Sequence, residues 1–235
     1  MEWVKTYLDE VTSTNQWLLE HGGKDKMIVT ADYQTAGRGC GSNSWESERG
    51  KNLLFSLLIH PEEVPASKQF YISMMTANGI SQVVSRYVRD VSVKWPNDIY
   101  VGDRKICGIL IQNRLQGSAI KDSIIGVGLN VNQLCFESDA PNPVSLANLT
   151  GRQHDREALL HQLIEAFEAE WANWEGARAR YLPLLYRRKG FHRYRDALTE
   201  FIAELVTVED DGRLLLRQVD GHTHHYAFKE VQFII

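Results

Sequence analysis

The chain has 235 residues, of which 43% are hydrophobic and 24% are charged, so it is long enough to bury a substantial core. Its 26 basic and 30 acidic residues give a formal net charge of −4, which argues against a nucleic-acid-binding protein, because such proteins carry a basic excess. The chain has no apolar run of roughly 18 residues and no apolar signal region at its N-terminus, so we expect a cytoplasmic protein without membrane contact. Three widely spaced cysteines, Cys40, Cys107 and Cys135, argue against a disulfide framework and a structural zinc site.

The first predicted elements are a helix and two strands. The helix is expected over 13–22, where small polar residues precede an apolar segment that ends at two glycines. Apolar segments at 27–31 and 53–59 are predicted strands. The polar, glycine-rich connection between them, 34–52, is too long for an ordinary hairpin, and connections of this length are usually functional or disordered.

A second group of elements combines two helical segments with a run of apolar strands. A helix is expected over 71–88, and strands over 91–95, 99–101, 105–112 and 123–131. A further helical stretch at about 155–182 carries apolar residues at intervals of three and four, which is typical of a stripe that faces a core.

The C-terminal part of the chain has a different pattern. Residues 186–190 indicate a boundary, and the short strand-like segments after it are separated by two Asp-Gly turn pairs. We therefore predict an α+β domain at 1–187, with a mixed or antiparallel sheet covered by helices against one face, and a small all-β domain at 188–235.

The first candidate functional segment is 34–45, QTAGRGCGSNSW. Three glycines within five residues allow the backbone to approach a ligand closely, and Arg38 between them offers a planar guanidinium to phosphate or carboxylate. The segment contains neither the P-loop nor the dinucleotide-binding fingerprint. On its own it therefore also fits a flexible surface loop.

The second segment is KWPND at 94–98, followed by a hairpin predicted to turn at 102–103. This turn places Asp98 opposite Cys107. Alternation of side chains then puts Asp98 and Lys105 on one face as diagonal neighbours, roughly 7–8 Å apart. The two groups would flank one reaction centre. A plain surface ion pair is the alternative, and a register shift of one residue would place the groups on opposite faces.

The third segment is GVGLNVN at 126–132. Glycines inside an apolar strand favour close approach of a ligand, and the amide of Asn130 can bind a polar edge. A β-bulge without a ligand is the alternative.

Taken together, these segments resemble the biotin protein ligases, and the resemblance covers nearly the whole chain. The similar motifs are STN at 13–15, the glycine-arginine loop at 34–45, KWPND at 94–98, KxxGIL at 105–110 and GxGxNVN at 126–132. The resemblance implies a catalytic domain followed by a small SH3-like barrel, without the N-terminal DNA-binding domain that some members carry.

The resemblance also implies a reaction, that of a biotin–[acetyl-CoA carboxylase] ligase. Such an enzyme activates biotin with ATP to biotinyl-5′-adenylate and transfers biotin to a lysine of a biotin carboxyl carrier protein. Lys105 and Arg38, with Mg²⁺, are expected to neutralise the repulsion between the biotin carboxylate and the α-phosphate. Asp98 is expected to orient the acceptor amine or to accept its proton. The Mg²⁺ ion is expected on nucleotide oxygens and water, without a set of protein ligands.

The same resemblance assigns binding roles within the motifs. The residues expected to bind biotin or its adenylate are Ser13, Thr14, Asn15, Gln34, Gly37, Arg38, Gly39, Cys40, Trp45, Lys94, Asn97, Lys105, Gly108, Gly126 and Asn130. Ser13, Thr14 and Gln34 are expected at the ureido ring and the carboxylate region of biotin. Trp45 is expected to cover the adenylate. The loop over the carboxylate and phosphate is 37–39, the nucleotide side has Lys94, Asn97 and Asn130, and biotin is expected against Gly108 and Gly126.

The glycine-arginine loop departs from the usual GRGRxGRxW pattern. Here it is GRGCGSNSW, in which Cys40 and Asn43 replace arginines and Ser42 replaces a glycine. Each charge-assisted hydrogen bond contributes roughly 1.5–3 kcal/mol. We therefore expect either a less tightly held adenylate or a replacement charge from elsewhere, such as Arg49 or Lys51.

Three alternative functions remain to be weighed. A lipoate-type acyl ligase is disfavoured by the KWPND and STN segments, and a biotin-dependent repressor by the acidic charge and by motifs that begin at residue 13. A biotin-sensing homologue without catalysis is disfavoured because Lys105 and Asp98 are both present. Both a monomer and a homodimer formed through an edge strand are open.

Overall fold

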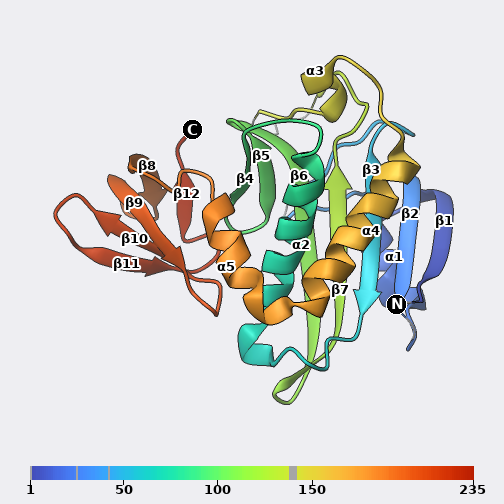
Figure 1. Ribbon diagram of the computed structural model, residues 1–235, viewed down its shortest axis with the longest axis horizontal. Coiled ribbons are helices and arrows are strands. Elements are labelled where there is room, and N and C mark those ends of the chain that lie inside the picture. The colour runs from blue at the N-terminus through green and yellow to red at the C-terminus, as the bar shows by residue number, and fades with distance from the viewer. Residues whose placement is uncertain (1, 25, 42, 138–141) are drawn as a thin grey trace.

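The computed structural model describes residues 2–24, 26–41, 43–137 and 142–235. In it a seven-stranded sheet is followed by a five-stranded sheet (Figure 1). The first sheet contains β1 (Val4–Val11), β2 (Met27–Gln34), β3 (Leu53–Ile59), β4 (Val91–Lys94), β5 (Asp98–Val101), β6 (Arg104–Gln116) and β7 (Ala119–Leu129), in the order β1-β2-β3-β7-β6-β5-β4. Among the strands of this sheet in the described residues, only β1 and β2 pair in parallel, so the expected mixed sheet is confirmed.

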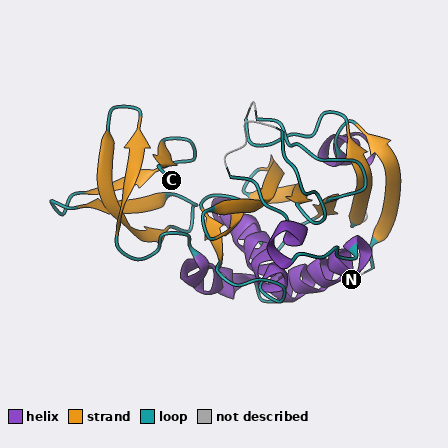
Figure 2. Cartoon of the chain, turned by 90° about the horizontal axis from the view of Figure 1, so that it is seen from above, coloured by secondary structure: helices purple, strands orange, loops and turns teal. Residues whose placement is uncertain are grey.

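The helices cover both faces of this sheet. They are α1 (Thr14–His21), α2 (Phe70–Val84), α3 (Leu146–Thr150), α4 (Arg156–Ala172) and α5 (Ala177–Tyr181), with 3₁₀ turns at Ala66–Lys68, Trp174–Gly176 and Leu182–Leu184. Figure 2 shows most helices on one side of the sheet. Leu18 of α1, however, packs against Val29 and Leu58, whose strand neighbours Ile28 and Leu57 belong to the larger core with α2 and α4. Because successive strand residues point to opposite faces, α1 lies on the other face, and the expectation that helices pack against one face is wrong for α1.

Some elements have boundaries that differ from the prediction, and one strand was not predicted. The helix expected over 155–182 consists of α4, a 3₁₀ turn and α5, because Asn173 leaves the helical conformation at φ −133° and ψ 45°. Asparagine favours such breaks, since its amide competes for backbone hydrogen bonds. The edge strand β1 was not predicted because half of its sequence, VKTYLDEV, is polar and its apolar residues do not alternate regularly. Within the described residues, no helix is long and apolar enough to cross a membrane.

The C-terminal part is an antiparallel sheet, as expected. It contains β8 (Phe191–Asp196), β9 (Glu200–Val208), β10 (Leu214–Gln218), β11 (Thr223–Tyr226) and β12 (Val231–Phe233), in the order β11-β10-β9-β8-β12. Gly212 and Gly221 end the two Asp-Gly pairs at φ values of +90° and +91°, a conformation that favours glycine. The predicted domain boundary at 187/188 lies between Tyr186, whose N–H bonds to Val93 of the first sheet, and the start of β8; it stays a prediction.

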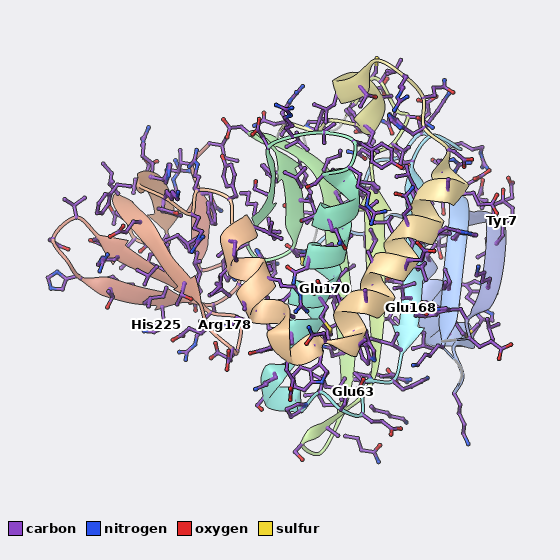
Figure 3. All side chains as sticks on the ribbon, viewed as in Figure 1. Tyr7, Glu63, Glu168, Glu170, Arg178 and His225 are labelled. Carbon is purple, nitrogen blue, oxygen red and sulfur yellow. The ribbon has the colours of Figure 1, made fainter. Side chains whose placement is uncertain are left out.

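The two sheets are joined by hydrogen bonds and by one continuous hydrophobic core. Arg178 of α5 donates from Nε to the carbonyl oxygen of Val208 (2.9 Å) and from its terminal nitrogen to Thr207 Oγ1 (3.0 Å). In Figure 3, Arg178 lies on the side of α5 that faces the C-terminal strands. Trp95 Nε1 donates to the carbonyl oxygen of Gly212 (2.9 Å). These bonds hold the C-terminal sheet next to the KWPND segment.

Candidate active site

A cavity of about 1150 Å³ opens between the seven-stranded sheet, the loop around residues 38–46 and the C-terminal strands. Fourteen of the expected binding residues line it, together with Asp98: Ser13, Thr14, Asn15, Gln34, Arg38, Gly39, Cys40, Trp45, Lys94, Asn97, Lys105, Gly108, Gly126 and Asn130. Gly37 is the exception. Its carbonyl oxygen accepts a hydrogen bond from the Trp45 N–H (2.9 Å) at the base of the loop. The fold therefore gathers all five motifs around one space.

The centre of the cavity contains an ion pair. Lys105 Nζ lies 2.7 Å from Asp98 Oδ1, and the two side chains are only 25% and 20% exposed. The predicted shared face is thus correct, but the predicted pairing is wrong: Asp98 lies opposite Gly108, not Cys107. The register shifts because Ile106 is an extra residue in β6, a β-bulge that the sequence pattern did not reveal.

The bulge decides which residues face the cavity. In a regular strand, residues three positions apart point to opposite faces. The extra residue brings Gly108 to the face of Lys105, so that a Cβ atom on Gly108 would lie 3.4 Å from Lys105 Cε and 2.8 Å from Trp45 Cζ3. Gly128, which pairs with Gly108, also touches this indole, at 2.5 Å from a built Cβ to Cε2. Two glycines thus form a flat floor on which Trp45 lies.

A polar wall stands beside this floor. The backbone N–H and the hydroxyl of Thr14 donate to Gln34 Oε1 (2.8 and 3.1 Å). Asn15 Nδ2 donates to Gln112 Oε1 (3.1 Å), and the buried Ser56 hydroxyl lies within hydrogen-bonding distance of both Thr14 Oγ1 (2.7 Å) and Asn15 Oδ1 (2.6 Å). The network fixes the rotamers of the STN segment, which makes it a preorganised surface for a polar ligand.

Ser56 and Gln112 were not identified from the sequence. A signal for Ser56 does exist, because it is a lone hydroxyl in the otherwise apolar strand LLFSLLI, and a buried hydroxyl requires a partner. Gly126, which was expected against biotin, is covered here by the Asn15 side chain: a Cβ atom on Gly126 would collide with Asn15 Oδ1.

Several polar groups in the cavity are available to a ligand. Ser13 begins α1 without a side-chain capping bond and lines the cavity, so its hydroxyl is not used by the helix. Asn130 donates to the Val144 carbonyl oxygen (3.2 Å), but its buried Oδ1 has no partner within the described part of the chain, and neither does the buried Nε1 of Trp45. Unpaired buried polar groups are costly, so both atoms favour a ligand that would satisfy them.

The cavity is lined by groups of both charges, since the carboxylates of Glu46, Asp98 and Glu137 stand among its cations. Arg38, Lys94, Lys105 and Lys229 are the cations that line it in the described residues. Burial lowers the pKa of Lys94, which stacks on the rings of Tyr100 and Phe233 at 5.2 and 5.5 Å. Arg38 is exposed and forms no ion pair within the described ranges.

The altered loop positions have clear surroundings where they are described. Cys40 is half-buried, and burial raises the pKa of its thiol, so it is a neutral group against Asn97 Nδ2 (3.5 Å). Ser42 lies outside the described residues. Neither Arg49 nor Lys51 lines the cavity. Arg49 instead forms ion pairs with Asp9 and Glu10, so the expectation that it supplies the missing charge is wrong.

Comparisons with known proteins identify the family of the chain. The sequence matches the biotin/lipoate A/B protein ligase family over residues 6–130, more than half of the chain. It is 28% identical over 235 aligned residues to the bifunctional ligase/repressor BirA of Bacillus spizizenii, covering 94% of this chain and 71% of that protein. It is also 28% identical over 225 residues to the biotin–[acetyl-CoA-carboxylase] ligase of Mycobacterium tuberculosis, covering 90% of this chain and 82% of that one.

The fold has a close counterpart among solved structures. The biotin protein ligase from Aquifex aeolicus, solved in complex with biotin and ATP, superposes with a TM-score of 0.82 over 98% of this chain and 99% of its own, at 22% identity. At so low an identity, the structural similarity shows only that the fold is shared, whereas the match to the family model shows common descent. The chain belongs to the biotin/lipoate A/B protein ligase family.

Proposed function

We propose that this protein is an ATP-dependent biotin protein ligase, which forms biotinyl-5′-adenylate and transfers biotin to a lysine of a biotin carboxyl carrier protein. The observation that carries the proposal is the position of the Lys105–Asp98 pair (2.7 Å) in the same cavity as the polar STN wall. An acyl-adenylating enzyme needs a cation at the reacting phosphate and a polar pocket for the acid, and both lie here within one space.

Biotin binding is assigned to the polar wall. The ureido ring of biotin has two N–H donors and one carbonyl acceptor, and the hydroxyls and amides of Ser13, Thr14, Asn15 and Gln34 offer the complementary groups. The apolar bicyclic ring is assigned to the floor formed by Gly108 and Gly128, from which the Trp45 indole would have to move aside.

The nucleotide is assigned to the opposite part of the cavity. Asn130 Oδ1 is a buried acceptor without a protein partner in the described residues, and the amino group of adenine is a donor that would satisfy it. The Lys94 ammonium also lines the cavity, at 5.5 Å from the Phe233 ring. The KWPND and GVGLN segments together therefore form the nucleotide side.

The first step joins two anions. An oxygen of the biotin carboxylate attacks the α-phosphorus of ATP, the new P–O bond forms, and the bond from the α-phosphorus to pyrophosphate breaks. Lys105 and Arg38 line the space and lower the electrostatic barrier by neutralising charge on the phosphate oxygens. Partial burial of Lys105 strengthens this effect, because electrostatic interactions are stronger where water is excluded.

The second step transfers the acyl group. The amine of the carrier lysine attacks the acyl carbon of the adenylate, the C–N bond forms, and the bond to the AMP oxygen breaks. The attacking amine must first lose a proton, since a free lysine has a pKa of about 10.4. Asp98 is assigned as the group that orients this amine and accepts the proton.

A divalent cation is part of the proposal as a companion of ATP. In the described residues no group of three or more His, Cys, Asp or Glu side chains could hold a metal ion. The residues present therefore fit an ion held mainly by phosphate oxygens and water, as Mg²⁺ usually is with nucleotides. Such an ion would add positive charge at the phosphates. A cytoplasmic location, the identity of the carrier and the choice between monomer and homodimer stay predictions.

The test of the proposal is direct. The protein is incubated with biotin, ATP, Mg²⁺ and a biotin carboxyl carrier domain, and the carrier is weighed by mass spectrometry. We expect one biotin added per carrier, and no product from a carrier whose acceptor lysine is changed to arginine. A second arm replaces biotin with lipoate. Product formation with lipoate but not with biotin would refute the biotin assignment.

A further inference from the structure

The glycine-arginine loop lacks two arginines, yet a cation from the C-terminal sheet lies against it. Cys40 and Asn43 stand where the family's pattern has arginine. Lys229, from the turn between β11 and β12, lines the same cavity as these two residues. Its Nζ lies so close to Gly41 that a Cβ atom built there would collide with it. The ammonium group thus lies against Gly41, the residue that directly follows Cys40.

The turn that carries Lys229 is well defined. Glu230 N–H donates to the carbonyl oxygen of Ala227 (3.1 Å), and the Glu230 carboxylate accepts from the Ala227 N–H (2.7 Å). Lys229 itself adopts a left-handed conformation at φ 71°, unusual for a residue with a side chain. Its ammonium lies 5.8 Å from the ring of Phe228, which also lines the cavity. The turn therefore directs one specific side chain at the loop.

Within the described part of the chain, Lys229 forms no ion pair with a carboxylate, although Glu46, Asp98 and Glu137 line the same cavity. It lies close enough to Cys40 to oppose the larger effect of burial, which raises the pKa of that thiol. A cation that faces a cavity without an ion-pair partner is a binding group for an anion.

We propose that Lys229 binds the phosphates of ATP and of the adenylate, and that it supplies from the C-terminal sheet the positive charge that the loop lacks at Cys40 and Asn43. This inference rests on the proposed function, since it takes the cavity to be a nucleotide site. It also gives the C-terminal sheet a part in the site: the sheet completes the phosphate-binding wall.

The experiment measures nucleotide binding without turnover. ATP and adenosine are titrated into the wild-type protein and into the Lys229→Met, Lys229→Arg and Lys189→Met variants. Lys189 is the matched control, because it is exposed, belongs to the C-terminal part of the chain and does not line the cavity. We expect Lys229→Met to weaken ATP binding about tenfold, the size of one charge-assisted contact, and to leave adenosine binding unchanged. Lys229→Arg and Lys189→Met should stay within about twofold of the wild type.

A second measurement tests whether the glycine-arginine loop can supply the positive charge lost from Lys229. Cys40→Arg, combined with Lys229→Met, should restore most of the lost ATP affinity. If Lys229→Met binds ATP as the wild type does, or if its only defect is transfer to the carrier, the inference is overturned. Thermal melts accompany each titration, and Lys229→Gln replaces Lys229→Met should the latter melt early.

The two proposals fail separately. A wild-type protein that binds ATP but forms no biotinyl-adenylate contradicts the proposed function, while the titrations still decide the role of Lys229. A wild-type protein that forms the adenylate while Lys229→Met keeps full ATP affinity contradicts the Lys229 inference alone.

Discussion

Lys105 and Asp98, to which we assign roles in the reaction, also interact with each other. At 2.7 Å and mostly buried, the carboxylate and the ammonium hold each other in place. The same pair can therefore serve both steps: the cation when two anions meet, the carboxylate when an amine must lose its proton. A test of these two roles must therefore measure adenylate formation and transfer to the carrier separately.

The first prediction concerns this pair. Lys105→Ala should abolish formation of biotinyl-adenylate, because it removes the cation at the reacting phosphate. Asp98→Ala should mainly slow transfer from purified adenylate to the carrier, by about 10²–10⁴-fold, the usual contribution of a general base. Pyrophosphate release reports the first step and carrier mass the second. Equal impairment of both half-reactions by both variants would rule out the division of roles.

The second prediction concerns the buried Lys94. Burial lowers its pKa below the ordinary lysine value, so its charge destabilises the folded state at neutral pH, where the unfolded chain carries the same charge in water. Lys94→Met should therefore melt at a higher temperature than the wild type at pH 7 and bind ATP less tightly.

The difference in melting temperature between Lys94→Met and the wild type should depend on pH, because the pKa of Lys94 is lowered by folding. The penalty is fully present below the lowered pKa of the folded protein, and it disappears as the pH rises from there towards the ordinary lysine pKa, because the folded state releases its proton first. The gap in melting temperature should thus narrow at alkaline pH. The exposed Lys5 provides the control variant Lys5→Met, and a gap independent of pH would contradict the assignment.

At the scale of the element, one extra residue in β6 organises the cavity. The Ile106 bulge turns Gly108 to the side of Lys105, next to Gly128 of β7, and the pair forms the flat floor under Trp45. A ligand that displaces the indole would meet the same floor. The absence of side chains at these two positions is therefore a requirement of the site.

The third prediction tests the floor. Gly128→Ala places a methyl group 2.5 Å from the present position of Trp45 Cε2, so the indole must move and the floor is no longer flat. Adenylate formation should fall at least about tenfold, which corresponds to 1.4 kcal/mol of lost binding. Gly23→Ala is the control, because nothing lies within 4 Å of a Cβ atom there. Equal adenylate formation by both variants would contradict the role of this glycine floor in the active site.

At the scale of the whole molecule, the C-terminal sheet is attached beside KWPND, the segment that we assign to the nucleotide. Trp95, which belongs to KWPND, donates to Gly212, and the Arg178 guanidinium bonds to β9 (Figure 3). Loosening this attachment should disturb the nucleotide more than biotin, because the polar STN wall is built from α1 and strands of the first sheet, without the C-terminal sheet.

The fourth prediction tests this attachment. Arg178→Ala should lower the free energy of unfolding by about 1.5–3 kcal/mol, the range for hydrogen bonds from charged groups, and raise KM for ATP more than KM for biotin. Arg193→Ala is the control: it removes an exposed ion pair with Glu200, which contributes under about 1 kcal/mol. Denaturant unfolding and initial rates measure both effects. Similar losses in the two variants would show that Arg178 does not join the sheets.

Local information sufficed for much of this architecture. The apolar strands and the two main helices follow from periodicity, and the motif residues follow from their chemistry, because both depend on neighbours along the chain. Edge strand β1 and the break at Asn173 were not predicted. Their local sequence signals are weak, and packing against the rest of the protein determines both features.

What the sequence by itself determined is the set of groups: the glycines, the Lys105 ammonium, the Asp98 carboxylate and the STN hydroxyls and amide. Only the tertiary structure decided their arrangement. The Ile106 bulge depends on pairing between strands, Ser56 and Gln112 join the wall through side-chain contacts, and Lys229 reaches the glycine loop because two sheets dock. Each of these depends on contacts between residues distant in the chain, and no local pattern encodes such contacts.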